Sequence, residues 1–251
     1  MPKFQELANA LADHLVEYCF SARRRGTPHT SVEWGKLHRE ARALLTRRAT
    51  SGEAGEILLY LLCECILGAP QMVAKMNLKT NPQDEIKGSD GIHMKWHEAD
   101  RILDVYFGES KLEQSLSSAL SHAFESVGKF HADGLLEHEV GLITSHFKWI
   151  DVPIAQQILN FVDRSTPATD FRINHACLIG YDWRDYNTLV GTTVAELTAD
   201  LTARLQADTI RLRDLINTRF DSFERKTLRV EVFFLPFRTV QEFRDAFIAA
   251  T

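Results

Sequence analysis

The stretch SDGIHMKWHEADRILDVYFGESK, residues 89–111, decides the fold. Apolar residues alternate with other residues in two segments, 90–97 and 102–111, and the polar residues 98–101 separate them. Because successive side chains of a strand point to opposite faces of the sheet, this pattern predicts a β-hairpin.

The register of this hairpin follows from its turn. If the chain turns about residues 99–100, opposite residues have numbers that sum to about 199. One face then carries four cross-strand pairs, which are Ile92 with Phe107, Met94 with Val105, Trp96 with Leu103, and Asp90 with Glu109. The first three pairs are large and apolar, as a surface that faces a core requires, whereas the last is a pair of carboxylates.

Carboxylates that face each other at about 5 Å repel, especially at the end of an apolar face, so a cation is expected between them. An all-oxygen site of this kind suits Mg²⁺ or Mn²⁺, and Lys111 lies on the same face, two residues beyond Glu109. A bound metal ion can polarise a phosphate and acidify a water molecule, while an ammonium group offsets charge in the transition state. Asp90, Glu109 and Lys111 therefore predict metal-assisted phosphodiester cleavage.

A helix predicted over residues 52–67 adds another acid. Apolar residues occupy nearly its whole circumference, which is typical of a helix that is buried on most sides. Glu56 shares a stripe of this helix with Tyr60, Cys63 and Leu67, so its carboxylate lies among residues that do not favour a charge. We expect Glu56 to reach the same metal ion or its water molecules.

The remaining elements predict a mixed α/β core, a mixed sheet flanked by helices. Residues 1–50 are expected to form an N-terminal helical region, with one helix over 3–20 and a second that Ser31 caps, and residues 51–251 the domain that carries the acids and Lys111. The other predicted elements are helices over 112–131, 137–147, 153–163, 194–223 and 240–249, and strands over 175–181 and 228–235.

The net charge of −5 argues against a protein that coats nucleic acid by charge alone. A local basic cluster precedes the hairpin, and its members are Arg23, Arg24, Arg25, Lys36, Arg39, Arg42, Arg47 and Arg48, against Glu33 and Glu40. This cluster is interpreted either as a contact surface for DNA or a partner protein, or as a solvated helix face.

Apolar stretches and cysteines place the chain in the cytoplasm, with no membrane contact expected. The longest apolar stretch, residues 57–62, is far shorter than the roughly 20 residues of a membrane-spanning helix, and the N-terminus does not have the pattern of a signal peptide. The four cysteines fit a reduced compartment, and the spacing of Cys63 and Cys65 does not favour a zinc site.

Together these segments resemble the PD-(D/E)xK nuclease core, which has a glutamate-bearing helix, then Ser89-Asp90-Gly91, then Gly108-Glu109-Ser110-Lys111. The resemblance implies that residues 51–251 form a nuclease-like domain. It also implies that Asp90, Glu109 and the backbone carbonyl of Ser110 bind the metal ion and that Lys111 assists catalysis. Ser89 stands where the motif has its proline.

Three segments, GEILLYLL (55–62), SDGIH (89–93) and FGESKL (107–112), are similar to the HamA family, the nuclease-like subunits of Hachiman anti-phage defence. This resemblance implies a DNA nuclease that a HamB-like helicase partner restrains until foreign or damaged DNA is engaged. The chain has no G-x-x-x-x-G-K-[ST] loop, so ATP use is expected of the partner.

Other interpretations stay open. The spacing of Asp90, Glu109 and Lys111 also arises by chance, in which case Lys111 forms a surface ion pair. The fold could serve as an inactive binding or regulatory subunit, and RNA could replace DNA as the substrate. His93 and His97 share the strand face opposite Asp90, and His93 is interpreted as a half-exposed residue or a substrate contact. Gln114 and His122, at the start and middle of the following helix, are interpreted in the same two ways.

Overall fold

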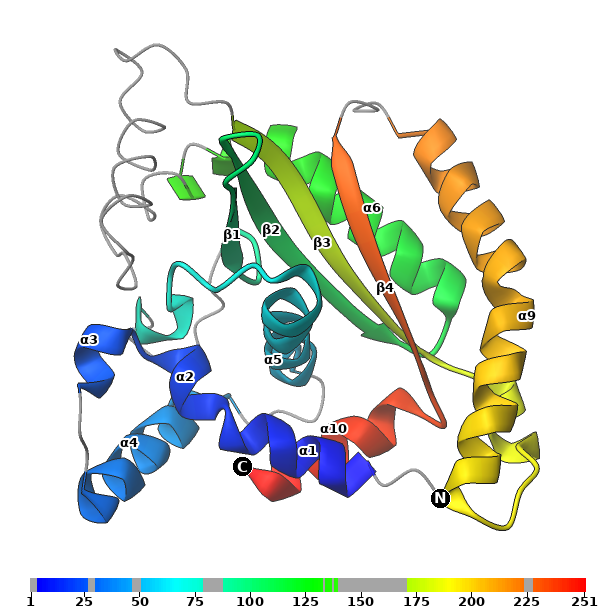
Figure 1. The fold of residues 1–251 in the computed structure, drawn as a ribbon, viewed down its shortest axis with the longest axis horizontal. Coiled ribbons are helices and arrows are strands. Elements are labelled where there is room, and N and C mark those ends of the chain that lie inside the picture. The colour runs from blue at the N-terminus through cyan, green and yellow to red at the C-terminus, as the bar shows by residue number, and fades with distance from the viewer. Residues whose placement is uncertain are drawn as a thin grey trace.

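A mixed sheet of four strands, in the order β1-β2-β3-β4, lies at the centre of the fold (Figure 1). The computed structural model describes residues 4–26, 30–46, 51–78, 88–132, 134–136, 138–139, 171–223 and 228–251. Antiparallel pairing joins β1 to β2, and parallel pairing joins β2 to β3 and β3 to β4. The strand bounds are β1 Ile92–His97, β2 Ile102–Glu113, β3 Phe171–Asp182 and β4 Arg229–Phe237.

The hairpin of β1 and β2 has the predicted register. Ile92 pairs with Phe107, Met94 with Val105, and Trp96 with Leu103. Arg101 closes the turn with a φ of 55°, in the left-handed region. The position of the turn together with the apolar alternation predicted this pairing, because a slip by one residue would turn the apolar side chains to the other face.

Helices cover both faces of the sheet, as the α/β prediction required (Figure 1). The ring of Phe107 lies 4.7 Å from that of Phe130 on α6, whereas a methyl group added at Gly108, on the opposite face, would lie 3.1 Å from Leu59 of α5. The helices that surround the sheet are α5 Glu53–Leu62, its π-helical continuation η1 Cys63–Leu67, α6 Leu116–Ala132, α9 Val194–Asp221 and α10 Val240–Ala250.

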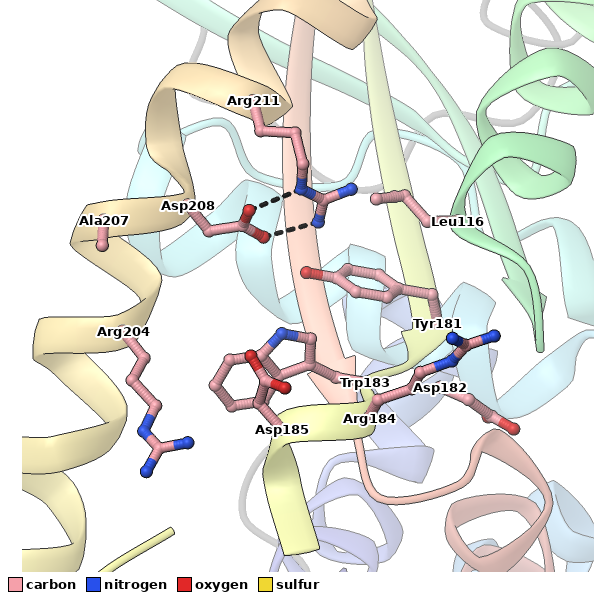
Figure 2. Close-up of a pocket in the computed structure, with 10 residues that line it drawn as sticks. All are labelled: Leu116, Tyr181, Asp182, Trp183, Arg184, Asp185, Arg204, Ala207, Asp208 and Arg211. Atoms are coloured by element: carbon pink, nitrogen blue, oxygen red, sulfur yellow. Dashed lines mark hydrogen bonds and ion pairs between the residues drawn. The ribbon is translucent and has the colours of Figure 1, made fainter. Parts of the chain in front are cut away.

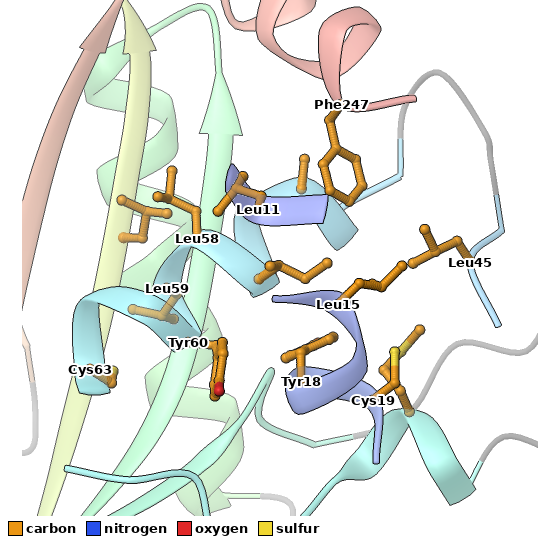
Figure 3. Close-up of a cluster of buried hydrophobic side chains, with 14 of the residues drawn as sticks. Leu11, Leu15, Tyr18, Cys19, Leu45, Leu58, Leu59, Tyr60, Cys63 and Phe247 are labelled. Carbon is orange, nitrogen blue, oxygen red and sulfur yellow. The ribbon is translucent and has the colours of Figure 1, made fainter. Parts of the chain in front are cut away.

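The N-terminal segment is helical, and it shares a buried cluster with the rest of the chain (Figure 3). Leu11 and Leu15 pack in the same cluster as Leu58 of α5 and Phe247 of α10. Short elements complete the described chain, namely α1 Phe4–Asp13, α2 Leu15–Cys19, α3 Ala22–Arg25, α4 Ser31–Ala43, η2 Lys75–Leu78 and η3 Arg184–Thr188. Across the described ranges, every helix is too short or too polar to cross a bilayer.

Three predicted boundaries were wrong. The first helix is interrupted at His14, where the backbone N–H donates to Leu11 three residues back and tightens the turn. Thr30, not Ser31, caps α4, because its side chain and that of Glu33 satisfy each other's backbone N–H groups. The predicted helix from residue 112 begins at Leu116, since β2 continues to Glu113. The helices predicted over 137–147 and 153–163 lie outside the described residues, apart from His138 and Glu139.

Gly180 tests the packing between β3 and its neighbours. An added methyl group would lie 2.4 Å from a Leu112 methyl carbon and 2.9 Å from the Phe237 ring. We expect Gly180→Ala to lower the free energy of unfolding by about 1–3 kcal/mol, measured by urea unfolding.

Gly35 of α4 offers the matched control, because an added methyl group meets only the Arg39 side chain, at 3.6 Å. Gly35→Ala should raise the free energy of unfolding by up to about 1 kcal/mol through helix propensity. Equal destabilisation by both changes would contradict this account of the packing.

Candidate metal centre at the sheet edge

Asp90 lies just before β1 and binds the backbone of β2. Its N–H donates to the Gly108 carbonyl at 2.8 Å, and its carboxylate accepts hydrogen bonds from the Ser110 backbone N–H at 2.6 Å and the Ser110 hydroxyl at 2.7 Å. The register places Gly91 opposite Gly108, and in a regular ladder the Gly91 N–H would bind the Gly108 carbonyl. Here the Asp90 N–H donates to that carbonyl instead, so the backbone leaves the regular ladder. The Asp90 carboxylate therefore lies against Ser110, just beyond the paired residues of β1.

Glu109 and Lys111 alternate with Ser110 along β2, so both project toward the α6 face. Their side chains form an ion pair with 2.6 Å between Lys111 Nζ and Glu109 Oε1. Ser126 of α6 also donates a hydrogen bond to Glu109. The structure thus brings Asp90, which precedes β1, together with Glu109 and Lys111 of β2, and Ser126 holds Glu109 from α6.

The electrostatics of the two acids are coupled. Burial, and then the nearby charge of Asp90, raise the pKa of Glu109 to about 7, although Lys111 and Ser126 act against this rise. Burial also raises the pKa of Asp90, against its hydrogen bonds from Ser110 and the charges of Lys111 and Lys75. Burial alone would lower the pKa of Lys111, but the Glu109 carboxylate raises it. Two carboxylates therefore lie near each other in a poorly hydrated place, where nearby positive charge stabilises their ionised forms.

Glu56 lies on the α5 side of the same region. Its carboxylate accepts a hydrogen bond from the Tyr18 hydroxyl at 3.0 Å, and a methyl group added at the preceding Gly55 would lie 3.1 Å from the Ser110 hydroxyl. Burial, followed by the charges of Glu56 and Asp90 among others, raises the pKa of Tyr18 well above its usual value. Tyr18 therefore lies close to both acids.

The donor set suits a hard divalent cation, with oxygen ligands from Asp90 and Glu109. In an antiparallel pair the N–H and C=O of one residue point to the same neighbour, so the Ser110 carbonyl faces the edge that Asp90 occupies. Among the described residues no three His, Cys, Asp or Glu side chains gather as a preformed metal cluster. In chemical type, the carboxylates of Asp90 and Glu109 and the Ser110 carbonyl are the residues that could hold such an ion.

Three of the predicted contact residues of the basic cluster are paired with acids. Arg24 forms an ion pair with Glu40 at 3.0 Å, and Lys36 approaches the same carboxylate at 3.8 Å. The other members that the structure describes also lie in α3 or α4, and they are Arg23, Arg25, Arg39 and Arg42. Of these, Arg25 pairs with Glu17, and Arg42 donates a hydrogen bond to the Ala250 carbonyl. Arg47 and Arg48 fall outside the described residues.

His93 was predicted to be half exposed or to touch substrate, and this prediction was wrong. Its side chain is 1% exposed, and Nδ1 lies 2.9 Å from the Ala69 carbonyl. The ring faces Tyr60 of α5, because α5 covers the sheet face that was expected to meet solvent. Gln114 is exposed after β2, and His122 pairs with Glu113 on the surface of α6.

Sequence reasoning missed four residues around the acids, which are Tyr18, Lys75, Ser126 and Glu139. Lys75 carried a usable signal, because it is a cation within the apolar run Met72-Val-Ala-Lys-Met76. The other three gave none, since their roles depend on contacts between distant segments.

The cavity at the C-terminal end of β3 is a different place (Figure 2). It measures about 540 Å³, lies between β3 and α9, and is not lined by Asp90 or Glu109. Its charged side chains are largely engaged: Arg211 donates two hydrogen bonds to Asp208, and Arg204 binds Asp200 and Thr188. Chemistry therefore places the candidate site at the acids and not in this hollow.

The sheet, its flanking helices and the two acids with a lysine define an α/β protein consistent with a nuclease-like core. The family model described as HamA matches residues 1–251, the whole length, so the chain belongs to the HamA family. Membership in this family supports a role in Hachiman anti-phage defence, within a partner complex. Comparisons with curated proteins and with solved structures give no match.

Replacing Glu109 by glutamine tests the electrostatics. A folded-state pKa of about 7 lies above the ordinary value, so the free energy of unfolding should fall as pH rises from about 4.5 to about 7 in metal-free buffer. Since one unit of pKa corresponds to about 1.4 kcal/mol, we expect a fall of about 3 kcal/mol. Glu109→Gln should remove most of this fall, measured by urea unfolding at pH 5 and pH 8.

Glu113→Gln is the control, because Glu113 lies on the same strand beside His122. It should keep the pH dependence of the parent. Identical pH profiles for the parent and Glu109→Gln would show that Glu109 ionises as a free acid.

Proposed function

We propose that the chain is a metal-dependent DNA nuclease, the effector of a Hachiman defence system, which hydrolyses phosphodiester bonds under the control of a partner helicase. The observation that carries this proposal is the convergence of Asp90, Glu109 and Lys111 at one end of β2. Family membership supports the defence role, and the chemistry of the acids supports the reaction.

Asp90, Glu109 and the Ser110 carbonyl would hold Mg²⁺ or Mn²⁺. When bound, such an ion polarises the scissile phosphate and lowers the pKa of a water molecule. The Ser110 N–H and hydroxyl orient the Asp90 carboxylate, and Ser126 orients Glu109. These side chains need little reorganisation, which is the property that makes electrostatic stabilisation effective.

Lys111 supplies the positive charge for the transferring phosphate. In the structure its ammonium group neutralises Glu109. Once a phosphate and its counter-ion share the site, the ammonium group can stabilise the additional negative charge of the transition state. Glu56, held by Tyr18, would orient water at the α5 side.

The overall negative charge of the chain does not attract DNA, so another feature must bring DNA to the site. The net charge is −5, and acids pair with much of the basic cluster in α3 and α4. A helicase partner that delivers DNA fits this charge distribution. Because the sequence has no P-loop motif, ATP hydrolysis would be carried out by that partner.

A second candidate is a binding or regulatory subunit that has lost catalysis. The observation in its favour is the Lys111–Glu109 ion pair, which already gives the acids a counter-charge. Calorimetry with Mn²⁺ separates the two functions. A nuclease should bind the metal ion, and Asp90→Asn or Glu109→Gln should weaken the binding, whereas a degenerate site should show none at these acids.

Cleavage tests the proposed function directly. Plasmid and linear DNA, and RNA as a competing substrate, are incubated with the chain and its helicase partner, with Mg²⁺ or Mn²⁺ or EDTA. Glu109→Gln and Lys111→Ala should each lower the rate by on the order of 10²-fold or more, because each removes a preorganised charge.

Arg238→Met serves as the control for a lost surface cation, since Arg238 pairs with Glu242 on the α10 side. It should cleave like the parent. Degradation of DNA by Glu109→Gln and Lys111→Ala at the parent's rate would refute the assignment.

A further inference from the structure

A buried ion pair lies beside Asp90 and outside the proposed catalytic set. Lys75 of η2 and Glu139, which follows α6, are 4% and 0% exposed, and 2.5 Å separates Lys75 Nζ from Glu139 Oε1. Burial of two charges is costly and often contributes nothing to net stability. A function other than stability is therefore the better explanation for this pair.

The pair holds both backbone polar groups of Ser89. The Ser89 N–H donates to Glu139 Oε1 at 2.9 Å, and the Ser89 carbonyl accepts a hydrogen bond from Lys75 Nζ at 2.5 Å. The Ser89 hydroxyl donates onward to the Gly91 carbonyl at 3.1 Å. The residues on both sides of Asp90 are thus fixed.

Gly88 makes this approach possible. Its φ is 100°, a conformation that residues with a side chain rarely adopt. A Cβ atom at this position would lie 1.8 Å from Glu139 Oε1. The chain therefore has glycine where the carboxylate of Glu139 reaches the backbone.

Asp90 is held from two directions as a result. On one side its own N–H binds Gly108 and its carboxylate binds Ser110 of β2. On the other side the preceding peptide is fixed by Lys75 and Glu139, from segments 14 and 50 residues away from Ser89. A displacement of either segment would release the Asp90 backbone.

We propose that Lys75 and Glu139 are positioning residues that fix Asp90 for metal binding, so that the site assembles only when both of their segments are docked. This inference rests on the proposed nuclease function. It assigns a role to the segment after α6, whose docking through Glu139 becomes a condition for activity.

The test compares two double variants of the full chain. Lys75→Met/Glu139→Leu removes both charges together, which avoids an unpaired buried charge, and it leaves Ser89 without either contact. Lys75→Met/Glu139→Gln retains an acceptor for the Ser89 N–H. We expect kcat to fall by on the order of 10²-fold in the first variant with little change in KM, and by less in the second.

Hydrogen exchange gives a readout that does not depend on activity. In the Leu variant the peptide that contains Ser89 and Asp90 should exchange at least about tenfold faster than in the parent, with intermediate exchange in the Gln variant. Peptides from β2 and β3 should keep the parent's protection, which shows that the fold is intact.

Arg172→Met/Asp104→Asn is the matched control. Asp104 is fully buried and binds Arg172 at 2.7 and 3.0 Å, at the other end of β2. This change should leave kcat and the exchange of Ser89 and Asp90 unchanged, and an equal loss of kcat here would overturn the proposal.

Parent-like exchange and kcat in the Lys75→Met/Glu139→Leu variant would also overturn the positioning role. Glu109→Gln separates this failure from failure of the proposed function. If Glu109→Gln cleaves like the parent, or if neither cleaves, the nuclease assignment is wrong, and the exchange data alone decide whether Lys75 and Glu139 fix Asp90.

Discussion

The hydrogen bonds from Ser110 to the Asp90 carboxylate are the interaction on which the candidate site depends. β1 is shorter than β2, so the Ser110 N–H has no strand neighbour at the edge where β1 ends. The carboxylate of Asp90 takes that place, at 2.6 Å. A backbone donor that would otherwise be unsatisfied is thereby used to orient an acid, and the unequal strand lengths become part of the site.

Much of the hairpin was predictable, and the reason is geometric. Both strands have apolar residues with a period of two, so only one register brings Ile92, Met94 and Trp96 opposite Phe107, Val105 and Leu103. The same register brought Asp90, Glu109 and Lys111 to one end of the sheet. Glu56 was singled out because a charge is conspicuous on a helix that is apolar around nearly its whole circumference, and its role at a metal ion stays a prediction.

The errors had a common cause, which is that sequence patterns describe one element at a time. His93 was expected at a half-exposed face, but α5 covers the second face of the sheet, so both faces are buried. The Lys75–Glu139 pair joins positions 64 residues apart, and no periodicity connects them. The departure of Asp90 from the ladder likewise depends on a backbone hydrogen bond that no side-chain pattern encodes.

The charges of the site explain why it needs support from so many segments. Asp90 and Glu109 repel each other in a buried place, and Lys111 neutralises only part of this repulsion. Left to local preferences, the Asp90 backbone would move away from Glu109. Ser110, Ser126 and the Lys75–Glu139 pair oppose that movement, so several segments of the chain together keep the two acids in place. In the proposed nuclease, any partner that shifts one of these supports would control the reaction without touching the substrate.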